Sequence, residues 1–278
     1  MNLTLGQGPK GNFDVAHLKA IHRHLFQDAY EWAGRTRDER VMLSDGTVAT
    51  EPVLRKVDGN AFMPGPFIGE ALERIVSSLR EQNYLRGLDR AEFSHRSAAI
   101  MVDLNGVHPF REGNGRTQRV FMSELALEAG HKLDFSVVSR ERMMQAGIAG
   151  NDKNDPRMRQ RLFNEIGDPQ RVAALTKAID ALDRHGFPWN NHYIATAEPG
   201  HKVEELRLAG VAGEQFMART KTTILIGQTR DLPEPRPEQG RNFDLLPTSW
   251  AEELAEYRRL RKSRSKTSEN DREQDHER

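Results

Sequence analysis

The stretch 108–119 gathers residue types that could do chemistry on a phosphate group. A short loop precedes a predicted helix and consists of Gly113, Asn114 and Gly115. Such a loop lets successive backbone N–H groups converge on an anion at the helix N-terminus. Arg116 and Arg119 follow three residues apart, so they project from nearly the same face of the first turns. Two guanidinium groups beside an N–H nest suit a polyphosphate better than a single carboxylate.

Two further side chains add a metal ligand and a base. Glu112 lies at the edge of the loop, where phosphate would repel a carboxylate unless a divalent cation lay between them. Mg²⁺ is commonly held in this way, by one carboxylate together with phosphate oxygens. His108 has the unperturbed pKa that suits proton abstraction at neutral pH, and Pro109 biases it toward an extended backbone. A glycine-rich turn with arginines is usually a solvated helix entry, but the full order of base, acid, nest and paired arginines is hard to obtain by accident.

The elements around this stretch are predicted to be mainly helical. Apolar residues recur at helical spacing in several segments, and Asp14 and Asp89 can cap two of them. Helices are expected at about 14–34, 67–83, from 89, and at 114–129, 139–148, 155–166 and 169–185. The segment 37–66 differs, since β-branched residues surround an Asp45-Gly46 turn signal and predict a β-hairpin or flap.

The C-terminal part has a different pattern. From about residue 190, short β-like runs are broken by Gly and Pro, which predicts a small β-module resembling a partly closed barrel. A Pro-rich linker follows, then a helix signal with Ser249 as its cap, and a polar tail with almost no apolar side chains.

Composition excludes several classes of protein. The 278 residues carry a formal net charge of zero, so nothing global favours nucleic acid or an anionic membrane. There is no cysteine, which excludes disulfides and thiolate metal sites. The chain shows no secretory signal and no run of transmembrane length, so we expect a cytoplasmic protein without a membrane partner. His22 and His24 cannot share one helix face, and the chain has no HExxH pattern, so no zinc site is expected. The other histidines are interpreted as ordinary surface or core residues.

The order of residues in 108–119 resembles the signature of the Fic family, His-Pro-Phe-x-(Asp/Glu)-Gly-Asn-Gly-Arg-x-x-Arg, and matches every fixed position. The resemblance covers about residues 12–190. It implies a mainly α fold, with a Fic helical core and a β-hairpin flap, followed here by a small C-terminal β (OB-like) module. The expected domains are a Fic domain at 12–190, the OB-like module at 191–247, and a charged helix with a disordered tail at 248–278.

The resemblance also implies an activity, that of a protein adenylyltransferase. His108 would accept a proton from a Tyr, Thr or Ser hydroxyl of a target protein, whose oxygen attacks the α-phosphorus of ATP and releases pyrophosphate. Glu112 would hold Mg²⁺, and the phosphates would be bound by the N–H groups of the loop and by two arginines: Gly113, Asn114, Gly115, Arg116 and Arg119. Phe110 is expected to pack in the core. Two alternatives stay open: a Fic enzyme that moves another phosphate-containing group, and a binding or delivery module whose nucleotide site is idle.

A flap in this family binds the modifiable segment of the target by main-chain pairing. The best match is the run Lys56, Val57, Asp58, Gly59, Asn60, Ala61 and Phe62. The surrounding segment is rich in charge, at Arg37, Asp38, Glu39, Arg40, Asp45, Glu51, Arg55 and Lys56. It is either a solvated loop or a surface that selects the target.

Partners follow from the same resemblance. A β-module after a Fic core is similar to the arrangement in Fic effectors and toxins associated with type IV secretion, which implies translocation into a host or recipient cell. A small GTPase and a topoisomerase are both candidate targets. Such effectors carry a further delivery domain, so a fragment of a longer protein is one interpretation of this chain. Aromatic residues suited to base stacking are scarce in the β-module, which speaks against nucleic acid.

Inhibition is expected to come from outside the chain. Many Fic proteins are held inactive by a short helix with the pattern (Ser/Thr)-x-x-x-Glu-(Gly/Asn), whose Glu pairs with the second signature arginine, here Arg119. The one match, at 265–270, lies in the polar tail without an apolar face for docking. We therefore expect a separate small antitoxin-like inhibitor.

Overall fold

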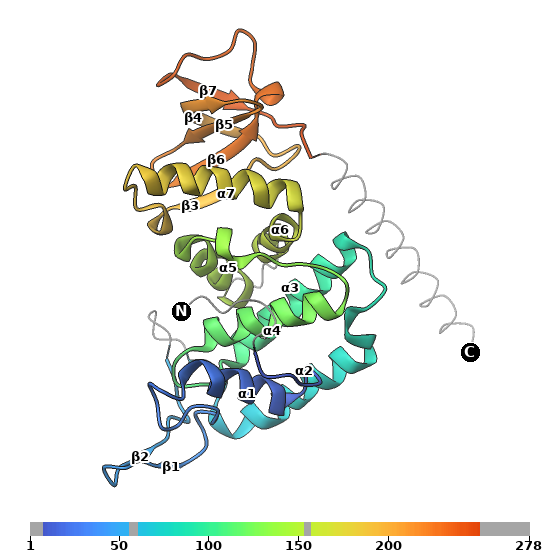
Figure 1. Ribbon diagram of the computed structural model, residues 1–278, viewed down its shortest axis with the longest axis vertical. Coiled ribbons are helices and arrows are strands. Elements are labelled where there is room, and N and C mark those ends of the chain that lie inside the picture. The colour runs from blue at the N-terminus through green and yellow to red at the C-terminus, as the bar shows by residue number, and fades with distance from the viewer. Residues whose placement is uncertain (1–7, 56–60, 153–156, 251–278) are drawn as a thin grey trace, which may run out of the picture. The chain divides into compact units, whose positions relative to one another are not determined.

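The computed structural model describes residues 8–55, 61–152 and 157–250 (Figure 1). Contacts divide the chain into two units, the first formed by residues 1–135 and 145–163 and the second by 136–144 and 164–278. The mainly helical fold with a β-hairpin and a C-terminal sheet is confirmed. The domain limits at 190 and 247 stay predictions. In the described part of the chain, no helix has both the length and the apolar character needed to span a bilayer.

Four helices form the part of the first unit up to residue 135, and all four were predicted. They are α1 (Val15–Phe26), α2 (Ile68–Glu81), α3 (Arg90–Val107) and α4 (Asn114–Glu128). The aspartate caps form as expected, because Asp14 accepts from the backbone N–H of His17 at 2.7 Å and Asp89 from that of Glu92 at 2.8 Å. Helix α1 ends earlier than predicted, and the chain continues through turns to Gly34, whose φ is +83°.

The core of this unit consists of apolar side chains that recur at helical spacing. They include Leu18, Ile21, Leu72, Val76, Leu79, Phe93, Met101, Leu104, Phe121 and Leu125. Burying such side chains is the main favourable contribution to folding. This core holds α3 and α4 together, and the signature residues lie at the junction between these two helices.

The segment between α1 and α2 contains two separate features. A short hairpin pairs β1 (Val41–Met42) with β2 (Val48–Ala49) around the predicted Asp45-Gly46 turn, in which Gly46 has a φ of +81°. Further along, Arg55 and Ala61 form an antiparallel bridge, and the N–H of Phe62 donates to the carbonyl of Leu54 at 2.9 Å. The predicted flap thus has paired flanks, while Lys56–Asn60 fall outside the described residues.

Helices continue after α4. They are α5 (Arg140–Asp152), α6 (Arg157–Ile166) and α7 (Pro169–Arg184), and α7 begins at the cap Asp168. The second unit contains a buried ionic cluster around Glu165. The Glu165 carboxylate accepts from Arg142, from Arg171 at 3.4 Å and from the backbone N–H of Thr196 at 2.7 Å. The two guanidinium groups lower the pKa of the Glu165 carboxyl against the opposing effect of burial.

The second unit also contains a five-stranded sheet in the order β3-β6-β5-β4-β7. The strands are β3 (Tyr193–Thr196), β4 (Val203–Ala212), β5 (Gln215–Arg219), β6 (Thr223–Gln228) and β7 (Asn242–Leu245). Strand β3 runs parallel to β6, and the other pairs are antiparallel. Strand β7 was not predicted, because its four residues follow a Pro-rich linker and alternate too briefly to give a signal. The predicted helix after Ser249 lies outside the described residues.

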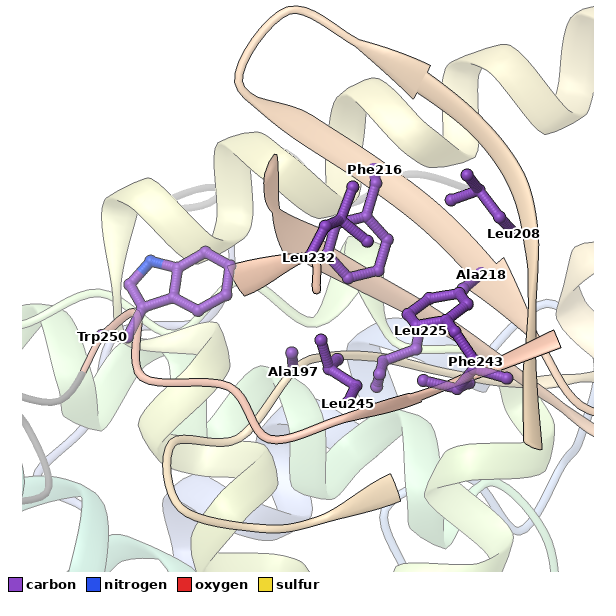
Figure 2. Packing of buried hydrophobic residues seen from close by; sticks show 10 residues of the cluster. Ala197, Leu208, Phe216, Ala218, Leu225, Leu232, Phe243, Leu245 and Trp250 are labelled. Atoms are coloured by element: carbon purple, nitrogen blue, oxygen red, sulfur yellow. The ribbon is translucent and has the colours of Figure 1, made fainter. Parts of the chain in front are cut away.

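One face of this sheet carries its own hydrophobic core (Figure 2). The cluster comprises Ala197, Leu206, Leu208, Phe216, Ala218, Leu225, Leu232, Phe243, Leu245 and Trp250. Gly227 lies directly opposite Phe216 in the register of β5 and β6. A Cβ atom on Gly227 would come within 2.3 Å of the Phe216 ring, so this ring is packed onto bare backbone.

Candidate active site

His108 is the C-cap of α3 and has a left-handed backbone. Its φ is 49° and its ψ is 61°, and its N–H donates to the carbonyl of Leu104 at 3.0 Å. The expected extended conformation was wrong: Pro109 excludes the right-handed helical region, but the left-handed region still closes the last turn of the helix. The imidazole is half-buried and stacks on Phe62, with ring centroids 3.9 Å apart and planes 16° apart. The structure therefore brings the proposed base against the end of the flap.

The loop between the two helices is held by the side chain of Asn114. Its amide oxygen accepts from the N–H of Phe110 at 2.9 Å, and its amide nitrogen donates to the carbonyl of Phe110 at 2.6 Å. Asn114 is the first residue of α4 and is 3% exposed. The buried amide thus shapes the loop, while the free N–H groups at the start of α4 point outward from the helix, as an anion site requires. Phe110 is buried, as predicted.

Gly113 caps α4 in a conformation and a space that only glycine fits. Its φ is +82°, and a Cβ atom there would lie 2.4 Å from the ring of Phe26. The guanidinium of Arg116 stacks over the same ring in a cation–π contact, with its Cζ 4.3 Å from the ring centroid. Phe26 therefore packs against the loop backbone and supports the first signature arginine.

The second signature arginine, Arg119, lies at the other end of the nest. Its Nη1 is 3.7 Å from the position of a Cβ atom built on Gly115. Burial, and then the nearby charge of Arg116, lower the pKa of Arg119. Neither arginine has a carboxylate partner within the described ranges. Two close cations without a counter-ion favour an anionic ligand between them.

Glu112 is exposed at the edge of the loop, where its Oε1 accepts from the N–H of Gly113 at 3.0 Å. No group of three or more His, Cys, Asp or Glu side chains suited to a metal occurs among the residues that the structure describes. A single exposed carboxylate fits Mg²⁺, which takes most of its ligands from phosphates and water. Glu112 alone among the described residues of the loop could then serve as a ligand for such an ion.

His22 contacts the loop from the core, in a role that the sequence did not indicate. Its Nδ1 accepts from the N–H of Gly34 at 2.8 Å, and its Nε2 lies 3.0 Å from the carbonyl oxygen of Glu112. The ring is fully buried and stacks on Phe110 at 3.9 Å. Because one nitrogen accepts and the other donates, the ring must be neutral, and burial lowers its pKa accordingly. The sequence did not indicate these contacts, since the partners lie 90 and 12 residues away along the chain.

Arg37 is the second residue whose role the sequence did not reveal. It was counted among the hairpin charges, but its side chain is fully buried. The guanidinium donates only to main-chain carbonyls: to His108 at 2.9 Å, to Glu51 at 3.2 Å, to Pro52 at 3.0 Å, to Val107 at 3.4 Å and, over a shorter distance, to Met63. It thus ties both flanks of the flap to the backbone of the proposed base.

The variable positions of the signature serve the scaffold. Thr117 donates through its hydroxyl to the carbonyl of Gly113 at 3.1 Å, and Gln118 donates to the carbonyl of Leu104 at 3.1 Å. Both side chains are buried, so they join α4 to the loop and to α3. Arg111 lies over the ring of Trp32, with 5.7 Å between Cζ and the centroid.

The fold and the site define a class: a helical domain in which a glycine-containing loop at a helix N-terminus lies between a histidine and two arginines, with one exposed carboxylate at its edge. The family model described as Fic/DOC family matches residues 12–126. A protein adenylyltransferase of Bartonella henselae is 38% identical over 229 residues, which are 82% of this chain and 41% of that relative. The chain belongs to the Fic family.

Two solved structures extend the comparison. The type IV secretion system effector protein BepA has a TM-score of 0.81 at 34% identity, and the match covers 89% of this chain and 83% of that one. The N-terminal Fic domain of a VirB-translocated effector from Bartonella quintana, solved with bound ADP, has a TM-score of 0.57 at 39% identity and covers 60% and 79%. The chain spans less than half of the length of its B. henselae relative.

Proposed function

We propose that the protein is a protein adenylyltransferase that moves AMP from ATP to a Tyr, Thr or Ser hydroxyl of a target protein. The observation that carries the proposal is the position of His108, one loop away from two close arginines without a carboxylate partner in the described parts of the chain. The name and the 38% identity of the B. henselae relative support the same activity. The bound ADP of the B. quintana structure supports a nucleotide in this site.

In the proposed reaction, the His108 imidazole accepts the proton of the target hydroxyl. The oxygen then forms a bond to the α-phosphorus, the bond from that phosphorus to the bridging oxygen breaks, and pyrophosphate leaves. Arg116 and Arg119 bind the outer phosphates and offset the charge that develops on the leaving group. The N–H groups of Gly113, Asn114 and Gly115 hold the nucleotide at the helix N-terminus. Catalysis is then mainly positioning, with one proton transfer.

Glu112 is the residue that would hold Mg²⁺. When bound, Mg²⁺ would supply positive charge that reduces the repulsion between this carboxylate and the phosphates. In the structure the Glu112 carboxylate accepts a hydrogen bond from the N–H of Gly113. Turning toward a cation would free that N–H for a phosphate oxygen.

The experiment uses ATP labelled on the α-phosphate and, in parallel, on the γ-phosphate, in lysates with the wild type and with His108→Ala. We expect protein label from the α position alone, and a loss of at least about 100-fold in the variant, the size of a general-base contribution. Label from the γ position would indicate another transferred group. Equal label with His108→Ala would contradict the role of the base, and no label at all would favour an idle nucleotide site.

The target and the inhibitor belong to the same proposal. The likeness to BepA supports an effector that acts on a protein of another cell after type IV secretion, with a small GTPase or a topoisomerase as candidate targets. An inhibitor supplied in trans would place a carboxylate against Arg119, which has no such partner in the described ranges. We expect that deletion from Arg261 onward leaves the labelling rate unchanged, and a large increase would instead assign inhibition to the tail.

A further inference from the structure

A pocket of about 600 Å³ opens between α2 and α3, beside the end of the flap. Its walls are more apolar than polar and come from three segments, with Phe62 at the end of the flap, Ile75 on α2 and Val102 on α3. Arg74 and Asp103 bring one charge of each sign to the lining. No residue of the proposed nucleotide site lines this pocket, so the pocket is separate from that site.

The pocket is nevertheless one side chain away from the proposed base. Phe62 lines it and also stacks on the His108 imidazole, with 3.9 Å between the ring centroids. Val107, which precedes the base in the chain, is also part of the lining. A group held in this pocket therefore lies next to the place where a hydroxyl must approach His108, which suits a residue that neighbours the modified one.

The charges of the lining indicate what that residue is. Arg74 is already engaged, since its Nη1 donates to the Glu70 carboxylate at 2.5 Å. Asp103 has no hydrogen-bond or ion-pair partner in the described part of the chain. Its side chain is reached by solvent, yet the surrounding protein raises its pKa by desolvation, as expected on the wall of a concave site. The uncompensated charge is negative, so the complementary ligand is a cation.

We propose that this pocket binds a lysine or arginine side chain of the target protein, close in sequence to the hydroxyl that is modified. The apolar walls would cover the aliphatic stem of such a side chain, and the Asp103 carboxylate would pair with its charged end. This inference rests on the proposed function for the identity of the ligand.

Gly106 provides a way to close the pocket without disturbing the nucleotide site. It lines the pocket from α3, and a Cβ atom there would meet no other atom within 4 Å. Gly69 on α2 has equally open space but does not line the pocket. Both are helical glycines without a positive φ, so Gly106→Leu and Gly69→Leu should both fold and should not lower the melting temperature. The two variants therefore form a matched pair.

The test is a selection for binding, which needs no catalysis. The full chain carrying His108→Ala, saturated with Mg²⁺ and a non-hydrolysable ATP analogue, is incubated with a pool of randomised nonapeptides that have tyrosine at the centre. We expect at least a fivefold enrichment of lysine or arginine at one flanking position in the retained peptides. Asp103→Asn should abolish this enrichment, and Asp103→Arg should replace it with glutamate or aspartate. Gly106→Leu should remove it, while Gly69→Leu should not.

Absence of any enriched basic position, including the case in which no peptide is retained, would overturn the proposal. So would an unchanged preference in both Asp103→Asn and Gly106→Leu. Enrichment of an apolar residue that Asp103→Asn does not affect would assign the pocket to a different side chain. Because binding is measured apart from AMP transfer, failure of the pocket and failure of the labelling experiment on wild type are distinguishable.

Discussion

At the residue scale, Gly113 shows how one missing side chain shapes the proposed nucleotide site. Its φ of +82° and the 2.4 Å approach of the Phe26 ring to a built Cβ atom leave no room for any other residue. We predict that Gly113→Ala displaces the start of α4 and lowers the rate of AMP transfer about 100-fold, the effect of misplacing a bound group by about 1 Å. The rate with α-labelled ATP and the calorimetric affinity for Mg-ATP measure the effect.

Gly130 is the matched control for this substitution. It follows the same helix with a φ of +83°, but a Cβ atom there would meet nothing within 4 Å. Gly130→Ala should therefore add only backbone strain, roughly 1–2 kcal/mol of unfolding free energy, and leave AMP transfer unchanged. If the two alanine variants lost activity to the same extent, the contact between Gly113 and Phe26 would not be the cause.

The neutral state of His22 predicts a dependence on pH. Because burial lowers the pKa of His22 from 6.5, the unfolded chain takes up a proton below about pH 6.5 that the folded protein does not bind. The unfolding free energy therefore falls as pH decreases through this range. We predict that the stability difference between wild type and His22→Gln shrinks between about pH 7.5 and 5.5, measured by urea denaturation. His17 and His95, whose pKa values are also shifted, are identical in both proteins and cancel. Parallel curves would contradict this role.

The sequence could reveal the signature residues, because their types and spacing lie within one short stretch. His22 and Arg37 could not be found in this way. Their partners are backbone atoms of Glu112 and His108, far away in the sequence. Every residue type has a backbone carbonyl, so such a partner cannot be recognised from its residue type. A buried arginine that donates only to carbonyls looks, in a sequence, like any charged loop residue.

At the element scale, Arg37 joins the flap to α3. Its guanidinium holds the carbonyls of Pro52 and Met63 on the two sides of the flap and that of His108. Lysine has three donors on one atom and cannot span these acceptors. We predict that Arg37→Lys lowers kcat and raises the KM for the target protein, each about tenfold or more, while the affinity for Mg-ATP stays within about twofold.

Arg35→Lys is the control for Arg37→Lys. Arg35 is two residues away and its side chain is 64% exposed, pairing only with Glu39 at 3.1 Å. Such a surface pair contributes little, so this variant should behave as wild type. A loss of Mg-ATP affinity in Arg37→Lys equal to the loss of target turnover would show general damage instead of misplacement of flap and base.

The β1–β2 hairpin remains a candidate for target selection, with a smaller set of charges than the sequence suggested. Arg37 is buried and Glu39 binds Lys19 at 2.6 Å, whereas Arg40 and Asp45 are exposed. We predict that the double variant Arg40→Glu, Asp45→Arg changes which proteins of a lysate are labelled and leaves Mg-ATP affinity unaltered. An unchanged pattern of labelled proteins would remove the hairpin from target selection.

Elements with a strong local signal were predicted well. The remaining elements depend on contacts between distant residues, which local sequence patterns do not indicate. Caps and apolar faces located α2, α3, α4 and α7 to within a few residues. Helix α1 ended early because the loop up to Gly34 is fixed by the bond from its N–H to His22, a contact without a local pattern. Strand β7 exists because it pairs with β4 across a long loop. Non-local pairing of this kind decides the state of short segments whose own propensity is weak.

At the scale of the whole molecule, the division into two units predicts that the sheet can be weakened without harming the nucleotide site. Gly227 in β6 belongs to the second unit, and a Cβ atom there would come within 2.3 Å of the Phe216 ring, which the sheet core encloses. Gly227→Ala should therefore overpack that core and lower its unfolding free energy by about 1–3 kcal/mol.

Gly210→Ala in β4, where a Cβ atom meets nothing within 4 Å, is the control and should be neutral. Calorimetric affinity for Mg-ATP should be equal in wild type and both variants, because every residue of the proposed nucleotide site lies in the first unit. A weaker Mg-ATP affinity in Gly227→Ala alone would mean that the two units fold and bind as one.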